Sequence, residues 1–114
     1  MGQINTKLFY TKMLTFGEAI RKFREENELP LRKIAALLDI DQSFLSKIER
    51  NERKATKEQV IQLAKIFKVN EKDLLIQYYS DKVAYDLVEE KAAKEILQVA
   101  EQKINYIRKN KKNK

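Results

Sequence analysis

The chain has 114 residues, a formal net charge of +7, and neither cysteine nor histidine. Its length can supply one modest hydrophobic core, and its composition excludes disulfide frameworks, thiolate chemistry and histidine-based acid–base or metal sites. Only two glycines and one proline are present, which argues against a fold rich in β-turns. No apolar run reaches membrane-spanning length and the start lacks the apolar core of a signal peptide, so we expect a cytoplasmic protein without membrane contact.

The first predicted helix begins at Thr15, after an N-terminal arm of residues 1–14 that has no clear pattern. Thr15 and Glu18 have the spacing of a capping box, in which each side chain bonds the backbone N–H of the other residue. Apolar residues then recur at i, i+3, i+4 and i+7, the period of one buried helical face. The members of this face are Phe16, Ala19, Ile20 and Phe23.

The stretch of residues 31–51 predicts two short helices joined by a tight turn. Apolar residues on both helices can share one core, namely Ile34, Ala35, Leu38, Leu45 and Ile48, and Ile40 lies in the turn. The turn, residues 39–41, is short enough to fold one helix sharply across the other. Asp41 is expected to cap the second helix through its carboxylate. The pattern is typical of a helix-turn-helix.

The second of these helices leaves a polar face, with Gln42, Ser43, Ser46, Lys47 and Arg50 pointing outward. Amides, hydroxyls and cations are the groups that contact base edges and phosphates. Basic residues gather at its end and in the loop after it, over eleven positions: Lys47, Arg50, Arg53, Lys54 and Lys57. A basic chain can simply have a well-solvated surface, but this clustering favours a phosphate-binding surface.

Two further helices complete the predicted core. Thr56 and Gln59 form a second capping box, and Val60, Leu63, Ala64 and Phe67 repeat the helical spacing. Asn70 is expected to cap a fifth short helix over Glu71–Tyr78, with Leu74 and Leu75 turned inward. The sequence therefore predicts an all-α domain of five helices over residues 15–79.

Residues 80–108 form a C-terminal segment of good helix-forming residues, with a break expected near residues 89–91. A stripe with alternating spacings of four and three is typical of a coiled-coil seam: Ala93, Leu97, Ala100, Ile104 and Ile107. The stripe packs either on its own domain or against a second copy, and we favour a homodimer. Residues 109–114 are predicted to be a basic, disordered tail.

Residues 15–79 resemble the DNA-binding domains of the phage-repressor and Cro type, the Xre family. The matching features are the small Ala35, Ile40 in the turn, and Leu45 and Ile48, followed by SKIERN and ERKATKEQ. The family usually has Gly where Asp39 and Asn51 stand, and Gln where Leu31 stands, so Arg32 is expected to replace that phosphate contact. The resemblance implies an internal ion pair between Arg24 and Glu49. The predicted DNA-binding residues are Arg32, Gln42, Ser43, Ser46, Lys47, Arg50, Asn51, Arg53, Lys54 and Lys57.

These features predict a sequence-specific transcriptional regulator, a repressor that binds an inverted-repeat operator in double-stranded DNA as a homodimer. The alternative is a protein-interaction module of the same fold, such as an antitoxin-like partner, with weak DNA binding. An enzyme is the weakest interpretation, because the carboxylates and lysines lie on solvated faces. We expect no catalytic residue, metal, cofactor or small-molecule ligand.

Overall fold

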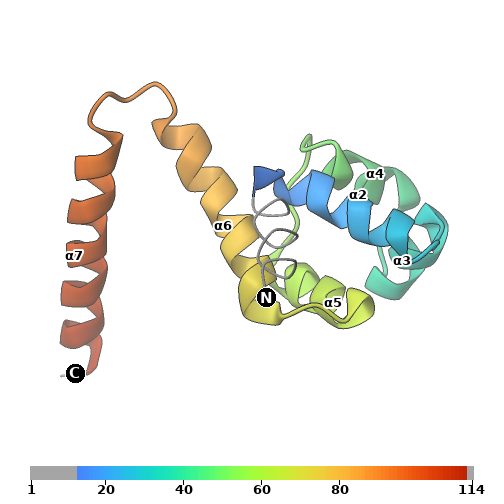
Figure 1. The fold of residues 1–114 in the computed structure, drawn as a ribbon. Helices are drawn as coiled ribbons and strands as arrows, with labels where there is room; N and C mark the ends of the chain where they lie inside the picture. Colours follow the sequence, from blue (N-terminus) through green and yellow to red (C-terminus); the bar gives the residue numbers. More distant parts are fainter. Residues whose placement is uncertain (1–12, 113–114) are drawn as a thin grey trace, which may run out of the picture. The chain divides into compact units, whose positions relative to one another are not determined.

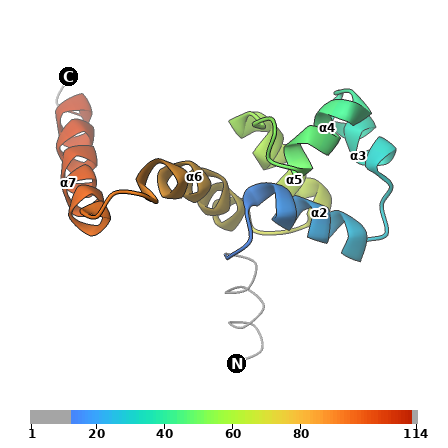
Figure 2. The ribbon, with the colours of Figure 1, turned by 90° about the horizontal axis from the view of Figure 1, so that it is seen from above.

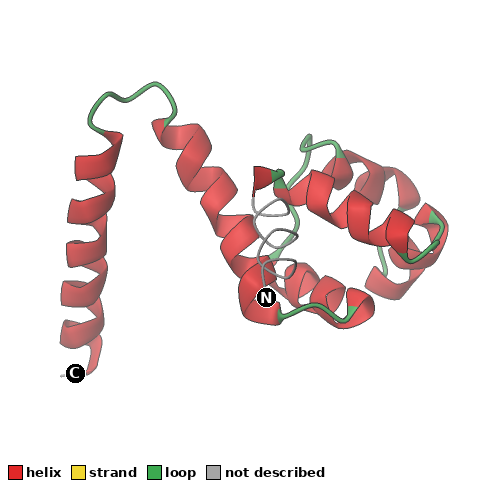
Figure 3. Cartoon of the chain, in the orientation of Figure 1, coloured by secondary structure: helices red, strands yellow, loops and turns green. Residues whose placement is uncertain are grey.

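The computed structural model describes residues 13–112, and helices connected by short loops account for nearly all of them (Figure 3). No strand occurs among these described residues. The chain divides into two compact units, and the boundary lies between Lys82 and Val83. The helices are α2 (Phe16–Glu26), α3 (Leu31–Leu38), α4 (Gln42–Glu49), α5 (Lys57–Phe67), α6 (Glu71–Leu87) and α7 (Ala93–Lys112) (Figure 1).

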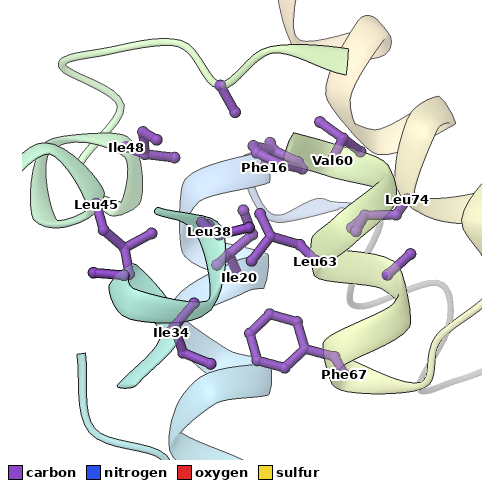
Figure 4. Close-up of a cluster of buried hydrophobic side chains, with 13 residues drawn as sticks. Phe16, Ile20, Ile34, Leu38, Leu45, Ile48, Val60, Leu63, Phe67 and Leu74 are labelled. Carbon is purple, nitrogen blue, oxygen red and sulfur yellow. The ribbon is translucent and has the colours of Figure 1, made fainter. Parts of the chain in front are cut away.

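The first unit is the predicted helix-turn-helix domain, and its all-α fold is confirmed. Helix α2 packs against α4 and α5, and α3 packs against the same two helices. Figure 2 shows the ribbon of these helices from above. Apolar side chains from all of them and from the start of α6 converge on one core (Figure 4). The fully buried large side chains are those expected from the helical spacing: Ile20, Ile34, Leu45, Ile48, Val60 and Leu63.

Most predicted helix starts are confirmed by their hydrogen bonds. At α2 the amide of Glu18 donates to Thr15 Oγ1 (3.1 Å) and the amide of Thr15 donates to Glu18 Oε1 (2.9 Å). Thr56 and Gln59 form the same box at α5. The prediction for Asp41 was wrong in one respect. It is the N-cap residue of α4 in extended geometry, but its side chain accepts no capping bond, so its carboxylate stays in solvent.

Two of the four positive φ angles among the described residues occur where the sequence has aspartate or asparagine and the resemblance to the Xre family implies glycine. Asp39 ends α3 with φ 56°, and Asn51 follows α4 with φ 63°. Short polar side chains tolerate this left-handed conformation better than most residues. Lys68 ends α5 in the same conformation (φ 56°), although it has no short polar side chain.

Helix α6 is longer than predicted. It starts after Asn70, whose Oδ1 accepts from the amide of Asp73 (3.0 Å), but it continues past Tyr78 to Leu87. No glycine or proline interrupts residues 71–87, so nothing in the backbone stops the helix at the edge of the core. The first compact unit extends along α6 to Lys82.

The first half of α6 is bonded to the rest of its unit at two carbonyls. The Gln77 side chain is 3% exposed and donates through Nε2 to the Leu14 carbonyl. The Tyr78 hydroxyl donates to the Ala55 carbonyl, and its ring meets Phe16 edge-on at 5.2 Å between centroids. Burial raises the pKa of the Tyr78 phenol. These contacts attach α6 to both the start of α2 and the loop before α5.

In the second unit the predicted break is confirmed, because residues 88–92 separate α6 from α7. The expected disorder of residues 109–114 is wrong for the part described, since α7 extends to Lys112. Lysine forms helices well, and cations near a helix C-terminus interact favourably with the helix dipole. No helix in residues 13–112 is both long and apolar enough to cross a membrane. Predictions for residues 1–12 lie outside the described part of the chain.

Candidate nucleic-acid interface

The core determines how α4 is presented. Leu45 and Ile48 are buried on one side of α4, and Ile34 and Ala35 of α3 are buried against the same core. At the turn, the amide of Ile40 donates a hydrogen bond to the Ala35 carbonyl (3.0 Å), and the chain changes direction there. With its apolar side buried, α4 has only one face left for solvent.

That free face carries most of the residues predicted to read DNA bases. Gln42 and Ser43 lie in the first turn of α4 and Lys47 lies one turn later, and all three are exposed. Ser46 is half-buried beside them. A helix of this kind, presenting amide, hydroxyl and ammonium groups from its N-terminal half, can place them on base edges in a major groove.

The predicted phosphate-binding residues are exposed, and most of them follow α4 in the sequence. Arg50 follows α4 and pairs with Glu52 (Nε to Oε2, 3.0 Å), an ion pair in which both side chains are more than half exposed. The Arg53 guanidinium lies 5.9 Å from the centroid of the Phe44 ring, a cation–π distance that favours one orientation of this arginine. Also exposed are Arg32, near the start of α3, and Lys54 and Lys57.

Asn51 stands apart from the other predicted contact residues because its side chain is turned toward α2. Its Oδ1 accepts from the amide of Gly17 (3.3 Å), and its Nδ2 donates to Thr15 Oγ1 (2.9 Å). Both ends of the amide are thus used within the protein. A DNA contact from Asn51 stays a prediction, whereas its role in joining two helices is visible in these bonds.

The predicted ion pair between Arg24 and Glu49 is present. The Arg24 Nε donates to Glu49 Oε2 at 2.7 Å and its Nη2 donates to Oε1 at 3.1 Å, while Nη1 donates to the Leu29 carbonyl. The two side chains are 16% and 6% exposed. The hydrogen bond to Glu49 raises the pKa of Arg24, with burial opposing it. This pair attaches the last residue of α4 to α2.

Acidic residues mark the edge of the interface. Asp39 and Asp41 line a shallow groove of about 430 Å³ beside the turn, together with apolar atoms of Ile40 and Phe44. Carboxylates repel phosphates, and none of the predicted DNA-binding residues lines this groove. In the part of the chain that the structure describes, no group of acidic side chains is arranged to hold a metal ion.

Three residues that pack or bond at the first turn of α2 were not predicted. Gly17 is buried in α2, and a helical glycine with no turn to make is itself a signal of close packing. Asp81 accepts from the amide of Phe16 through Oδ2 at 2.6 Å, and Gln77 bonds Leu14. Nothing local in the sequence distinguishes these two α6 residues, because each bond spans more than sixty positions.

A solved structure of a SinR protein/SinI protein complex is similar to this chain, with 20% sequence identity and a TM-score of 0.49, over 86% of this chain and 99% of that one. No curated protein was found to match. A family model for the helix-turn-helix domain matches residues 17–80, more than half of the sequence. The chain therefore belongs to the helix-turn-helix domain family.

Proposed function

We propose that the protein is a sequence-specific DNA-binding transcriptional regulator of the Xre type, and that α4 is its recognition helix. The observation that carries this proposal is the exposed face of Gln42, Ser43 and Lys47 on a helix attached to the core through Glu49. Glutamine suits the N6/N7 edge of adenine, and lysine suits the O6/N7 edge of guanine. The side chains that would read bases therefore belong to a rigid element.

The flanking basic residues supply the sequence-independent part of binding. Arg50, Arg53, Lys54 and Lys57 follow α4, Arg32 lies on α3, and all five are exposed, so they can neutralise phosphates. Each neutralised phosphate releases counterions, so binding would weaken steeply with added salt. Since these residues position the protein on the duplex, the specificity must come from the face of α4.

We further propose that the regulator binds an inverted-repeat operator as a homodimer and represses by occupying it. Each chain has one recognition helix, so two copies would read half-sites about 34 Å apart, or a multiple of that distance. Leu97, Ile104 and Ile107 of the predicted seam are 48%, 48% and 52% exposed. Burying such a stripe against a second copy would gain roughly 25 cal/mol for each Å² of apolar surface removed from water.

The alternative of an antitoxin-like interaction module also draws support from this exposed stripe, which a different protein could cover. The two proposals differ in what α4 does. A module with weak DNA binding has no use for a basic surface around an exposed polar helix face. We therefore favour DNA binding, and we assign no catalytic activity to the chain.

Selection of bound sites from random double-stranded DNA by the full chain tests the proposal. We expect enrichment of a sequence with two-fold symmetry. The selected duplex should bind about 10³-fold or more tightly than a scrambled duplex of the same composition. Equal affinity for both duplexes, or no salt-dependent binding to either, would contradict the proposal and favour the interaction module.

A further inference from the structure

The first turn of α2 is held on one side by α6. The Asp81 carboxylate accepts from the amide of Phe16 at 2.6 Å, and Gln77 donates to the carbonyl of Leu14. Asp81 is half-buried, and Gln77 is 3% exposed with its amide nitrogen bonded. A carboxylate suits this place, because a helix N-terminus presents unpaired N–H groups and a partial positive charge.

The same turn is held on the other side by the residue that follows α4. Asn51 accepts from the amide of Gly17 and donates to the hydroxyl of Thr15. Gly17 permits this approach, since a β-carbon there would lie 2.7 Å from Asn51 Oδ1 and 2.5 Å from the Ile48 carbonyl oxygen. The turn therefore touches the C-terminal end of α4 directly.

These bonds alternate along four consecutive residues. Leu14 and Phe16 bond to α6, whereas Thr15 and Gly17 bond to Asn51. Phe16 and Gly17 begin α2, and the amide of Ala19 donates to the Thr15 carbonyl (2.9 Å), so helical hydrogen bonding makes the residues of this turn move together. Close-packed contacts transmit such a displacement rather than absorb it.

We infer that Asp81 and Asn51 are positioning residues for DNA recognition: through the first turn of α2, Asp81 holds the C-terminal end of α4 in the position that fits a base sequence. The inference rests on the proposed function. It concerns affinity for a selected site, because reading base edges demands exact placement of α4, whereas phosphate contacts tolerate small shifts. Neither residue needs to touch a base to act in this way.

Binding of Asp81→Ala to the selected duplex and to a scrambled duplex tests the inference, with Asp86→Ala as the matched control. Asp86 is an exposed aspartate on the same helix, so both variants change the net charge equally. We expect Asp81→Ala to bind the selected duplex about five- to tenfold more weakly than Asp86→Ala, with equal binding to the scrambled duplex. Asp81→Asn, which keeps an acceptor oxygen, should recover most of the loss.

A purely structural role for Asp81 gives a different result. It would lower the urea midpoint of Asp81→Ala but leave the folded protein with the operator affinity of Asp86→Ala, and this outcome would overturn the inference. Asp81→Leu, which has about the size of asparagine but no acceptor oxygen, supplies the measurement if the alanine variant does not fold. Asn51→Ala should lower affinity for the selected duplex in the same direction.

Amide NMR spectra without DNA separate this inference from the proposed function. In Asp81→Ala we expect chemical-shift changes to reach Asn51 and the last turn of α4, and in Asp86→Ala we expect them to stay on α6. Changes confined to α6 and Phe16 would overturn the coupling. If the parent protein prefers no DNA sequence, the proposed function fails, while these spectra still decide whether α6 positions α4.

Discussion

Gly17 lies so close to the backbone of Ile48, at the end of α4, that no side chain fits between them. A β-carbon on Gly17 would be 2.5 Å from the carbonyl oxygen of Ile48 and 2.6 Å from that of Glu49. Both oxygens belong to the backbone, so they cannot rotate away as the end of a flexible side chain would. The contact between α2 and α4 is therefore made by main-chain atoms, and its geometry depends on the glycine.

Gly17→Ala should consequently destabilise the protein, although alanine is the better helix former by about 1 kcal/mol. Separating two packed backbones typically costs about 1–3 kcal/mol, which exceeds that gain. Urea unfolding of the variant measures the net effect. Gln98→Ala, an exposed change to alanine on α7, reports propensity without a clash. A Gly17→Ala protein as stable as its parent would contradict the close contact.

The Arg24–Glu49 pair should contribute far more to stability than the exposed pair between Arg21 and Glu25 on the same helix. Arg24→Ala leaves a buried carboxylate without its partner, which typically costs about 3–5 kcal/mol. Arg21→Ala breaks an i,i+4 pair whose side chains are 61% and 57% exposed, and such pairs contribute under about 1 kcal/mol. Urea unfolding of Arg24→Ala and Arg21→Ala measures how much free energy of unfolding is lost when the arginine of each pair is removed. Similar losses would show that burial of the Arg24 pair has no energetic consequence.

Alanine variants of the proposed base-reading residues and of the proposed phosphate-binding residues should change DNA binding in different ways. Gln42→Ala or Lys47→Ala should cost about 1–3 kcal/mol on the selected duplex and relax the preference at one or two positions. Lys54→Ala should weaken binding to selected and scrambled duplexes alike and make the salt slope shallower by about one unit. Titrations of both duplexes over a salt series measure these effects. A change of base preference in Lys54→Ala alone would place the recognition surface elsewhere.

The proposed dimer seam can be tested by one charge placed on either side of α7. Ile104→Glu puts a carboxylate in the apolar stripe, whereas Gln102→Glu puts the same charge on the opposite side of the helix. We expect Ile104→Glu to sediment as a monomer and to bind the operator more weakly, because each recognition helix would then act nearly alone. Gln102→Glu should remain dimeric. If the Ile104→Glu protein is still a dimer, the dimer interface does not lie at the stripe.

Asp81 should make stability depend on pH in a predictable direction. Burial raises the pKa of its carboxyl above the 3.8 of a free aspartate, the bond from the Phe16 amide opposes this rise, and the Glu18 carboxylate adds to it. The folded state therefore binds the proton more tightly than the unfolded chain does. The resulting stability is fully present below pH 3.8 and is lost as the pH rises through the raised pKa.

Asp81→Asn cannot titrate, so its stability relative to the parent should increase with pH across this window and then level off. Urea unfolding at a series of pH values measures the difference, and Asp86→Asn corrects for the change in net charge. A difference between Asp81→Asn and the parent that falls with pH would reverse the sign of the argument.

Much of the fold could be predicted because its determinants are local. Thr15 with Glu18 and Thr56 with Gln59 start helices within four residues of sequence, and each box formed as expected. The apolar spacing likewise predicted the buried face of each short helix, because burial on a helix repeats with the helical turn. Exposure of Gln42 and Lys47 followed from the same period, since a residue outside the apolar face must point to solvent.

Other features were decided only by the tertiary structure. The point at which α6 leaves the core is one of them: Leu74 and Gln77 are buried, whereas most of residues 82–87 are exposed, and the helix-forming residues on both sides of Tyr78 cannot reveal this change. From the sequence, Asn51 is predicted to contact DNA. In the folded chain its side-chain amide forms hydrogen bonds with Gly17 and Thr15 instead. Asp81 and Gln77 acquire their partners across more than sixty residues, so only the folded chain brings them to the first turn of α2.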